Sequence, residues 1–507
     1  MRYKPPGPPA HPVRHWLQMA RTDPQALLTF SAIRLAAMIR SGDLSSAEAV
    51  EAHIRRIEQV NPKINAVVRD RFARARLEAT MADETRGPSS PPLHGVPCTI
   101  KESFALEGMP NTSGLLARRG VVASSDAPGV ARLRRAGAIP LGVSNTSELC
   151  MWMESNNRVY GRTRNPYDPR CTVGGSSGGE GAIIGAGGSP FGLGSDVGGS
   201  IRMPAFFNGV FGHKPTGGLV PNTGQFPCPD AGTTMDRYVT TGPICRRAED
   251  LMPLLRILAG PDATVGEPGS VELDRLTILD VPDDGGIPID PELRGAQKRC
   301  ADLLAARGAR VISTRISDLR RSFEIWSAMM SAAGGPSFSE LLGQGTPINP
   351  LLQLLLWLVG RSPHTLPALG LAALERFPRL SPRWEQQMLV RGEALRRELV
   401  ERIGNDGVLL YPSHPRPAPR HNAPLLRPFA WAYTGIFNVM QLPATQVPLG
   451  LSRRGLPLGL QVVSGPGRDH VTIAVALELE RRIGGWRPPP SLYPAAHQPL
   501  VFGGAET

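Results

Sequence analysis

Strand-like and helix-like spacings of apolar residues alternate along most of this chain. Short apolar runs bounded by polar turns predict β-strands at 96–100, 139–143, 408–411, 446–449 and 458–463. Apolar residues at helical spacing predict helices at 130–136 and 471–483. Alternating strands and helices are typical of α/β proteins. We therefore predict an α/β fold whose sheet takes strands from both ends of the chain, without an internal repeat.

A further helix is predicted to begin at Ser45. Ser45 and Glu48 have the spacing of a capping box, in which each side chain accepts a hydrogen bond from the backbone of the other residue. Apolar residues then recur at Val50, Ile54, Ile57 and Val60. We expect this helix to stop at Asn61-Pro62, because proline disrupts a helix interior.

The region from about 320 to 400 has a different character. It contains two apolar runs, 351–359 and 366–374, that are flanked by arginines. Neither run reaches the 18 or more apolar residues of a membrane-spanning helix. The two runs fit either an interfacial hairpin or channel lid, or ordinary core helices. The sequence leaves both interpretations open.

Composition and charge narrow the class of protein. Hydrophobic residues make up 41% and charged residues 20% of the 507, which is normal for a folded protein and excludes general disorder and a multi-spanning membrane protein. The net charge is +12, but the basic residues are scattered and form no stripe interleaved with aromatic residues. We therefore expect no nucleic-acid partner, while contact with an anionic membrane surface stays open.

The cysteines and the N-terminal residues indicate a compartment. The six cysteines, 98, 150, 171, 228, 245 and 300, include no C-x-x-C pair, which argues against a zinc site and a disulfide scaffold. We expect free thiols and no metal. The first residues are proline-rich and lack the apolar stretch of a secretory signal, so we expect a cytoplasmic protein.

A glycine-rich stretch is the strongest candidate for chemistry. Twelve of the 26 residues from Gly174 to Gly199 are glycine, which lets backbone N–H groups approach a ligand closely. The stretch has no lysine, so it does not match a phosphate-binding P-loop. Ser176 formally fits the G-x-S-x-G elbow of α/β-hydrolases, but the preceding residues 165–170 are turn-like and not a strand.

Five segments together resemble the amidase signature family, and within it the fatty-acid amide hydrolases of the second type. The segments are 99–104, 108–114, 147–154, 174–181 and 194–209, in the order and spacing of that family. The resemblance implies an α/β fold with one large mixed, mostly parallel twisted sheet flanked by helices on both faces. It covers a catalytic domain at 28–497 that includes the helical segment near 320–400, with an N-terminal extension at 1–27 and a C-terminal tail at 498–507.

The resemblance implies three catalytic residues: Ser200 as nucleophile, Ser176 as a bridging serine after a cis peptide bond, and Lys101 as the base. A serine needs a base to become a good nucleophile, and lysine is a base only when it is neutral. Burial of Lys101 among apolar neighbours would lower its pKa. A hydroxyl both donates and accepts, so Ser176 can pass the proton. No cofactor is implied.

The resemblance also assigns supporting residues. The backbone N–H groups of Val197, Gly198, Gly199 and Ser200 correspond to the oxyanion hole, the donors that stabilise a developing negative charge. We expect Asp196 and Arg202 to pair as structural support. Ser177 and Ser195 are expected to support the catalytic residues without taking part in the reaction.

The substrate is predicted to be an amide with an apolar acyl group. Cys150, Met151, Trp152 and Met153 correspond to the wall of an acyl channel in the family, although plain core packing is an alternative. Fatty-acid amides, aryl amides, esters and carbamates all fit the same chemistry. A glutaminase-type amidotransferase subunit and a non-catalytic scaffold are the rival functions, and peripheral membrane contact and a homodimer stay open.

Overall fold

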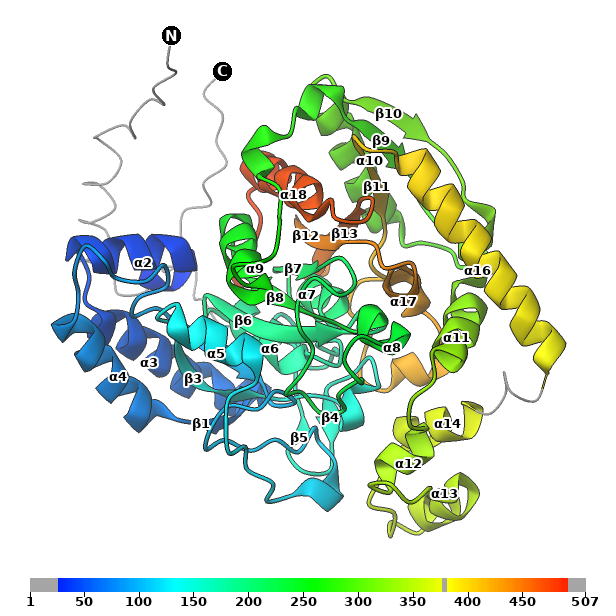
Figure 1. The fold of residues 1–507 in the computed structure, drawn as a ribbon, viewed down its shortest axis with the longest axis horizontal. Helices are drawn as coiled ribbons and strands as arrows, with labels where there is room; N and C mark the ends of the chain where they lie inside the picture. The colour runs from blue at the N-terminus through cyan, green and yellow to red at the C-terminus, as the bar shows by residue number, and fades with distance from the viewer. Residues whose placement is uncertain (1–25, 376–380, 491–507) are drawn as a thin grey trace.

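The computed structural model describes residues 26–375 and 381–490, which are built around an 11-stranded sheet (Figure 1). In sheet order the strands are β1 (Val67–Asp70), β3 (Ile139–Ser144), β2 (Pro97–Lys101), β6 (Phe191–Asp196), β8 (Thr240–Cys245), β7 (Phe211–Lys214), β12 (Ala444–Leu451), β13 (Pro457–Val463), β11 (Gly407–Tyr411), β9 (Thr277–Asp280) and β10 (Arg310–Ser313). A small hairpin pairs β4 (Asn156–Asn157) with β5 (Gly161–Arg162). Because β7 pairs with β12, the sheet takes strands from both ends of the chain, as predicted.

The sheet is mixed, as expected, but it is not mostly parallel. Within the described residues, parallel pairs occur where β2 meets β3 and β6, and where β9 meets β10 and β11. The strands in between, from β6 through β8, β7, β12 and β13 to β11, pair antiparallel. The connection between β12 and β13 is only residues 452–456, which is too short for the crossover that a parallel pair needs.

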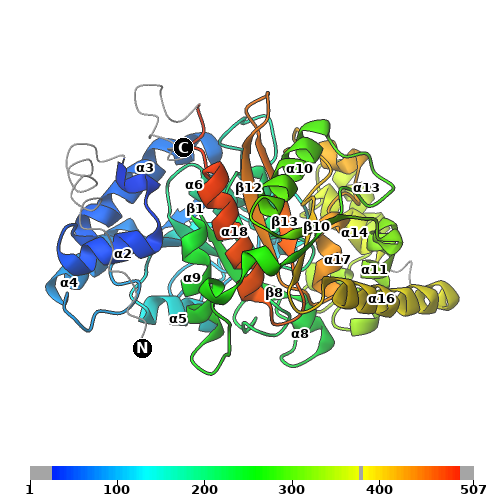
Figure 2. The same ribbon diagram turned by 90° about the horizontal axis from the view of Figure 1, so that it is seen from above.

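Helices cover both faces of the sheet (Figures 1 and 2). The described helices are α2 (Ala32–Ser41), α3 (Ser46–Ile64), α4 (Phe72–Glu84), α5 (Pro128–Arg135), α6 (Gly178–Gly185), α7 (Arg202–Phe207), α8 (Thr234–Tyr238), α9 (Leu251–Ala259), α10 (Pro291–Ala305), α11 (Ser322–Ala333), α12 (Phe338–Leu342), α13 (Pro350–Leu358), α14 (Leu366–Leu374), α16 (Pro382–Ile403), α17 (Ala432–Val439) and α18 (Asp469–Ile483). In β7, Gly212 lies against Ala205 of α7, whereas the next residue, His213, contacts Asp469 of α18. Since successive strand residues point to opposite faces, α7 and α18 lie on opposite sides of the sheet.

Helix α3 begins as predicted but ends later. Ser45 Oγ accepts from the Glu48 N–H at 3.0 Å and Glu48 Oε2 accepts from the Ser45 N–H at 2.8 Å, which confirms the capping box. The helix continues through Pro62 to Ile64 and ends at Asn65, whose φ is 50°. Ile64 is buried in the core, and this packing offsets the hydrogen bond that proline cannot donate.

The region around 320–400 is helical, and its members differ in burial. α14 buries Ala368, Leu369 and Ala372, whereas α13 buries only Pro350. Leu351, Leu352, Leu355 and Leu358 of α13 are exposed, so α13 does not fit the interpretation as a core helix. In the two described ranges, no helix combines the length and the apolar character needed to cross a membrane.

Parts of the predicted domain organisation lie outside the described residues. The N-terminal extension, 1–27, is described only at its last two residues, and the C-terminal tail, 498–507, is not described. The short gap at 376–380 falls within the helical region. The boundaries of the catalytic domain therefore stay predictions.

Candidate active site

Lys101 and Ser176 are in direct contact at the end of strand β2. Lys101 is the last residue of β2, and Ser176 lies in the turn that leads into α6. The Nζ of Lys101 is 2.7 Å from Ser176 Oγ, and it donates to Ser195 Oγ of β6 at 2.9 Å. The peptide bond between Gly175 and Ser176 is cis, as the family resemblance implied. Residues from three separate segments thus meet around one amine.

The surroundings of Lys101 favour the neutral amine. Its side chain is fully buried, and burial lowers its pKa because it disfavours the charged ammonium. Glu180, the nearby acid on α6, is itself buried, and burial raises its pKa to about 7. Its carboxyl group accepts a hydrogen bond from the Thr99 hydroxyl at 2.6 Å. Because Glu180 is only partly ionised near neutral pH, it supports the ammonium form of Lys101 less than a permanent carboxylate would.

Ser200 lies beside this pair, at the edge of a cavity. It stands between β6 and α7, is 8% exposed and lines the cavity. The Ser177 N–H donates to the Ser200 carbonyl at 3.3 Å, and Ser177 Oγ donates to the Ser195 carbonyl at 3.3 Å. These bonds join the segment that carries Ser176 to the segment that carries Ser200. Among the described residues, no hydrogen bond joins Ser176 Oγ to Ser200 Oγ. Catalytic hydrogen bonds are often long without substrate and tighten in the complex.

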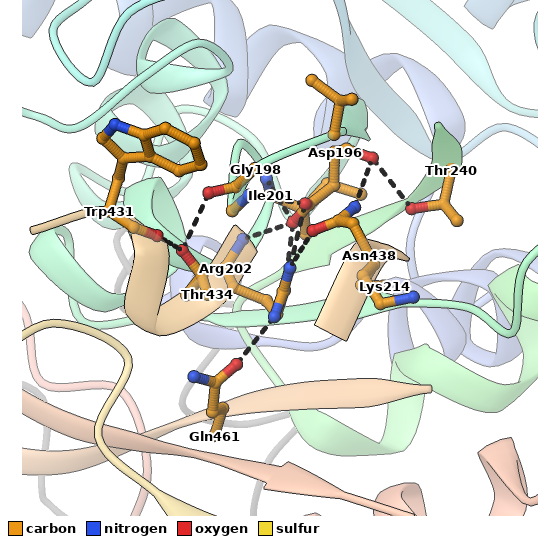
Figure 3. A network of polar contacts seen from close by, with 12 residues as sticks. Asp196, Gly198, Ile201, Arg202, Lys214, Thr240, Trp431, Thr434, Asn438 and Gln461 are labelled. Carbon is orange, nitrogen blue, oxygen red and sulfur yellow. Dashed lines mark hydrogen bonds and ion pairs between the residues drawn. The ribbon is translucent and has the colours of Figure 1, made fainter. Parts of the chain in front are cut away.

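The loop that carries Ser200 is held by a buried carboxylate. Asp196 accepts from the N–H groups of Gly199 at 2.7 Å and Ile201 at 3.0 Å, and from the Arg202 guanidinium at 3.0 Å (Figure 3). Both side chains of the Asp196–Arg202 pair are 0% exposed. Burial alone would raise the pKa of Asp196, but the adjacent Arg202 lowers it to about 2. The loop is therefore organised around a permanent negative charge.

This arrangement corrects one expectation about the oxyanion hole. Val197, Gly198 and Ser200 line the cavity, but Gly199 does not. The Gly199 N–H already donates to Asp196, because its φ of 112° turns the backbone toward that carboxylate. The candidate anion-binding N–H groups are therefore those of Val197, Gly198 and Ser200.

The cavity has a volume of about 800 Å³ and mostly apolar walls. Cys150, Met151, Trp152 and Met153 all line it, which places the predicted acyl-channel segment at the cavity wall. Cys150 Sγ is 3.2 Å from Ser113 Oγ. Helix α14 contributes further apolar residues, among them Leu371 and Leu374.

Another part of the cavity wall is aromatic and was not predicted from the sequence. It consists of Phe323, Trp326, Phe429 and Trp431. The Trp326 and Trp431 rings meet edge to face with centroids 4.6 Å apart. These residues lie more than a hundred positions after Ser200, so no local spacing links them to it. In the two described ranges, no cluster of three His, Cys, Asp or Glu residues could hold a metal ion.

Several known proteins with similar sequences or structures are named as amide hydrolases. The family model described as amidase matches residues 48–473. Fatty-acid amide hydrolase 2-A of Danio rerio is 49% identical, with 94% of this chain and 93% of that protein covered. Fatty-acid amide hydrolase 2 of Homo sapiens is 47% identical, with coverage of 91% and 90%. Among solved structures, 6-aminohexanoate cyclic dimer hydrolase gives a TM-score of 0.77 at 28% identity, covering 92% of this chain and 99% of that one.

Proposed function

This protein belongs to the amidase signature family of amide hydrolases, and on that premise we propose that it cleaves amides of apolar carboxylic acids through Ser200, Ser176 and Lys101. The contact of 2.7 Å between the buried Lys101 amine and Ser176 Oγ carries the proposal. A buried lysine with a lowered pKa is suited to accept a proton, and a surface lysine is not.

The first half of the reaction forms an acyl-enzyme. Neutral Lys101 accepts the proton of Ser176, while Ser176 accepts the proton of Ser200. Ser200 Oγ attacks the amide carbon, and the carbonyl oxygen becomes an oxyanion that the N–H groups of Val197 and Gly198 stabilise. The C–N bond then breaks as the proton returns from Lys101 through Ser176 to the leaving amine.

The second half releases the acid. Water replaces the amine and gives its proton to Lys101 by the same route, and the resulting hydroxide attacks the ester of Ser200. Ser200 regains its proton when the ester bond breaks. The enzyme returns to its starting state without a cofactor.

The cavity supports an apolar acyl group. Its volume of about 800 Å³ and its walls of methionine, leucine and aromatic side chains suit a long alkyl or aryl acid. Two relatives with 47% and 49% identity are named fatty-acid amide hydrolases. The walls include polar residues such as Glu324 and Ser331, but most of their surface is apolar, which fits an apolar acyl group better than the polar head of glutamine.

We further propose that α13 contacts a membrane surface. Leu351, Leu355 and Leu358 are 71%, 63% and 73% exposed, so one short helix presents a row of apolar side chains to solvent. α13 packs on α14, which lines the cavity. An apolar amide dissolved in a bilayer would thus meet the protein close to the site where it is cleaved.

The proposed reaction is tested by hydrolysis of p-nitroanilides and fatty-acid amides of graded acyl length. Wild type is expected to cleave long apolar amides, and Ser200→Ala and Lys101→Ala to lose activity by at least about 10³-fold, because each removes a member of the relay. A fluorophosphonate probe should label Ser200 in wild type alone. Full activity of Ser200→Ala would overturn the choice of nucleophile.

A further inference from the structure

Every backbone carbonyl of the loop before Ser200 has its own hydrogen-bond donor. The Asp196 carbonyl accepts from Asn438 Nδ2 at 2.9 Å and from Thr240 Oγ1 at 3.2 Å. The Val197 carbonyl accepts from Trp326 Nε1 at 2.9 Å, the Gly198 carbonyl from Thr434 Oγ1 at 2.9 Å and the Gly199 carbonyl from the Met203 N–H at 2.7 Å. Figure 3 shows Asn438, Thr240 and Thr434 around the loop.

These bonds determine where the N–H groups point. In a planar trans peptide, the C=O of one residue and the N–H of the next point in opposite directions. A donor that holds the Val197 carbonyl therefore also holds the direction of the Gly198 N–H. Glycine has no Cβ to restrict its rotation, so at Gly198 this external anchor matters most.

We propose that Trp326 is a positioning residue that aims the Gly198 N–H at the oxyanion through its indole N–H bond to the Val197 carbonyl. The proposal rests on the proposed function of Ser200 as nucleophile. Gly198 and Val197 both line the cavity, which places this peptide beside the reacting carbonyl. Trp326 never touches the oxyanion and acts through the peptide that it holds.

Trp326 differs from the other anchors because it also forms part of the cavity wall. Asn438 and Thr434 are fully buried side chains of α17, whereas Trp326 of α11 lines the cavity and packs edge to face on Trp431. The Trp431 ring in turn lies against Gly198, where an added Cβ would stand 3.2 Å from it. A substrate that presses on the Trp326 ring limits its movement and thereby keeps the Gly198 N–H aligned. Substrate binding and oxyanion stabilisation are thus linked through one side chain.

The test is Trp326→Phe, which keeps an aromatic ring and removes the N–H. We expect kcat for a p-nitroanilide to fall about tenfold, roughly the worth of one hydrogen bond and less than the 10² to 10³ for loss of an oxyanion donor. Any rise in KM, caused by the smaller cavity wall, should be no larger than that of Trp431→Phe. The affinity for a trifluoromethyl ketone, whose adduct with Ser200 carries an oxyanion, should fall by the same factor as kcat. An unchanged kcat and ketone affinity would overturn the proposal.

Two further variants separate positioning from packing. Site-specific replacement of Trp326 by benzothienylalanine keeps the two-ring shape and loses only the N–H, so it should reproduce the loss of kcat even if Trp326→Phe is unstable. Trp431→Phe makes the same change at the neighbouring tryptophan, whose N–H donates to no loop carbonyl within the described residues, and it should raise KM because it removes part of the cavity wall. A benzothienylalanine variant with wild-type kcat would refute the positioning role.

Ser200→Ala, assayed in parallel, separates this proposal from the proposed function. An inactive Ser200→Ala together with an unaffected Trp326→Phe would reject the role of Trp326 alone. An active Ser200→Ala would instead reject the assignment of Ser200 as nucleophile. The proposed position of the oxyanion, and with it the role of Trp326, would then fall as well.

Discussion

At the scale of single residues, the buried Lys101 amine sets how activity depends on pH. Its pKa is lowered by burial, and only the neutral form accepts a proton. Activity is therefore present above the lowered pKa and lost as the pH falls through it. This acid limb lies below the pKa of about 10.4 that an exposed lysine has.

The first prediction concerns this acid limb. We expect log kcat/KM to fall by about one unit per pH unit below the pKa of Lys101. Lys101→Arg places a group at the same position that stays protonated at every working pH, so it should be inactive even at alkaline pH. Initial rates between about pH 5 and 10 on a soluble anilide measure both effects. An arginine variant that recovers at high pH would contradict the role of Lys101 as base.

The second prediction concerns the buried Asp196–Arg202 pair. Arg202 also donates to Gln461 at 2.7 Å and to Asn438 at 2.7 Å, so Arg202→Leu leaves the buried Asp196 carboxylate without its positive partner and two buried amide oxygens without that donor. We expect the free energy of unfolding to fall by about 3–5 kcal/mol. Urea denaturation of Arg170→Leu is the control, because the ion pair of Arg170 with Asp168 lies at the surface. Equal midpoints for both variants would contradict the structural role of Arg202.

At the scale of elements, α13 stands out because its sequence is apolar but most of its side chains are not buried. Most helices of the fold bury apolar residues in the core, whereas four of the six leucines of α13 are exposed to solvent. Helix formation does not require this burial, because Asn349 caps the helix by accepting from Leu351 and Leu352 N–H groups. The exposed row is therefore available to contact an apolar surface.

The third prediction is that Leu355→Glu and Leu358→Glu weaken binding to vesicles of phosphatidylcholine and phosphatidylserine. Each change places a charge in the proposed contact and opposes the anionic lipid, so the bound fraction in co-sedimentation should fall several-fold. Leu77→Glu is the matched control, because Leu77 is a 67% exposed leucine on α4. Loss of a dimer in solution without any change in vesicle binding would instead assign the face to a second copy of the chain.

At the scale of the whole molecule, the cavity combines segments that are far apart in the chain. Met151 and Trp152 follow β3, α11 and α14 come from the helical region near 320–400, and Trp431 precedes α17. Each apolar CH₂ buried in such walls contributes about 0.8 kcal/mol, or about fourfold in affinity. We expect kcat/KM to rise with acyl length until the cavity is full.

The fourth prediction is that filling the cavity shortens this length profile. Gly370 of α14 lines the cavity, and a Cβ added there would meet nothing within 4 Å. Gly370→Leu is therefore expected to lower kcat/KM for the longest acyl amides by about tenfold or more and to affect short ones much less. Gly295→Leu on α10, outside the cavity, is the control. If Gly370→Leu lowered kcat/KM equally at every acyl length, Gly370 would not contact the acyl group.

Local sequence patterns were enough to predict helices and strands of this protein, and its motifs were enough to indicate the family. The predicted strands appear within a few residues of their expected positions, the run 366–374 is a helix with those bounds, and the Ser45–Glu48 cap is present. These features depend on neighbours in the chain, so periodicity and capping residues suffice to predict them. The spacing of the motifs likewise pointed to Lys101 and Ser176, which are in contact.

Only the tertiary structure decided features that depend on residues far apart in the chain. The antiparallel pairing of β7 with β12, the continuation of α3 through Pro62 and the engagement of the Gly199 N–H by Asp196 follow from packing and hydrogen bonds that no local pattern encodes. The same holds for the aromatic wall. Trp326 is 129 positions from the carbonyl that it binds, and only the folded sheet and its helices bring the two together.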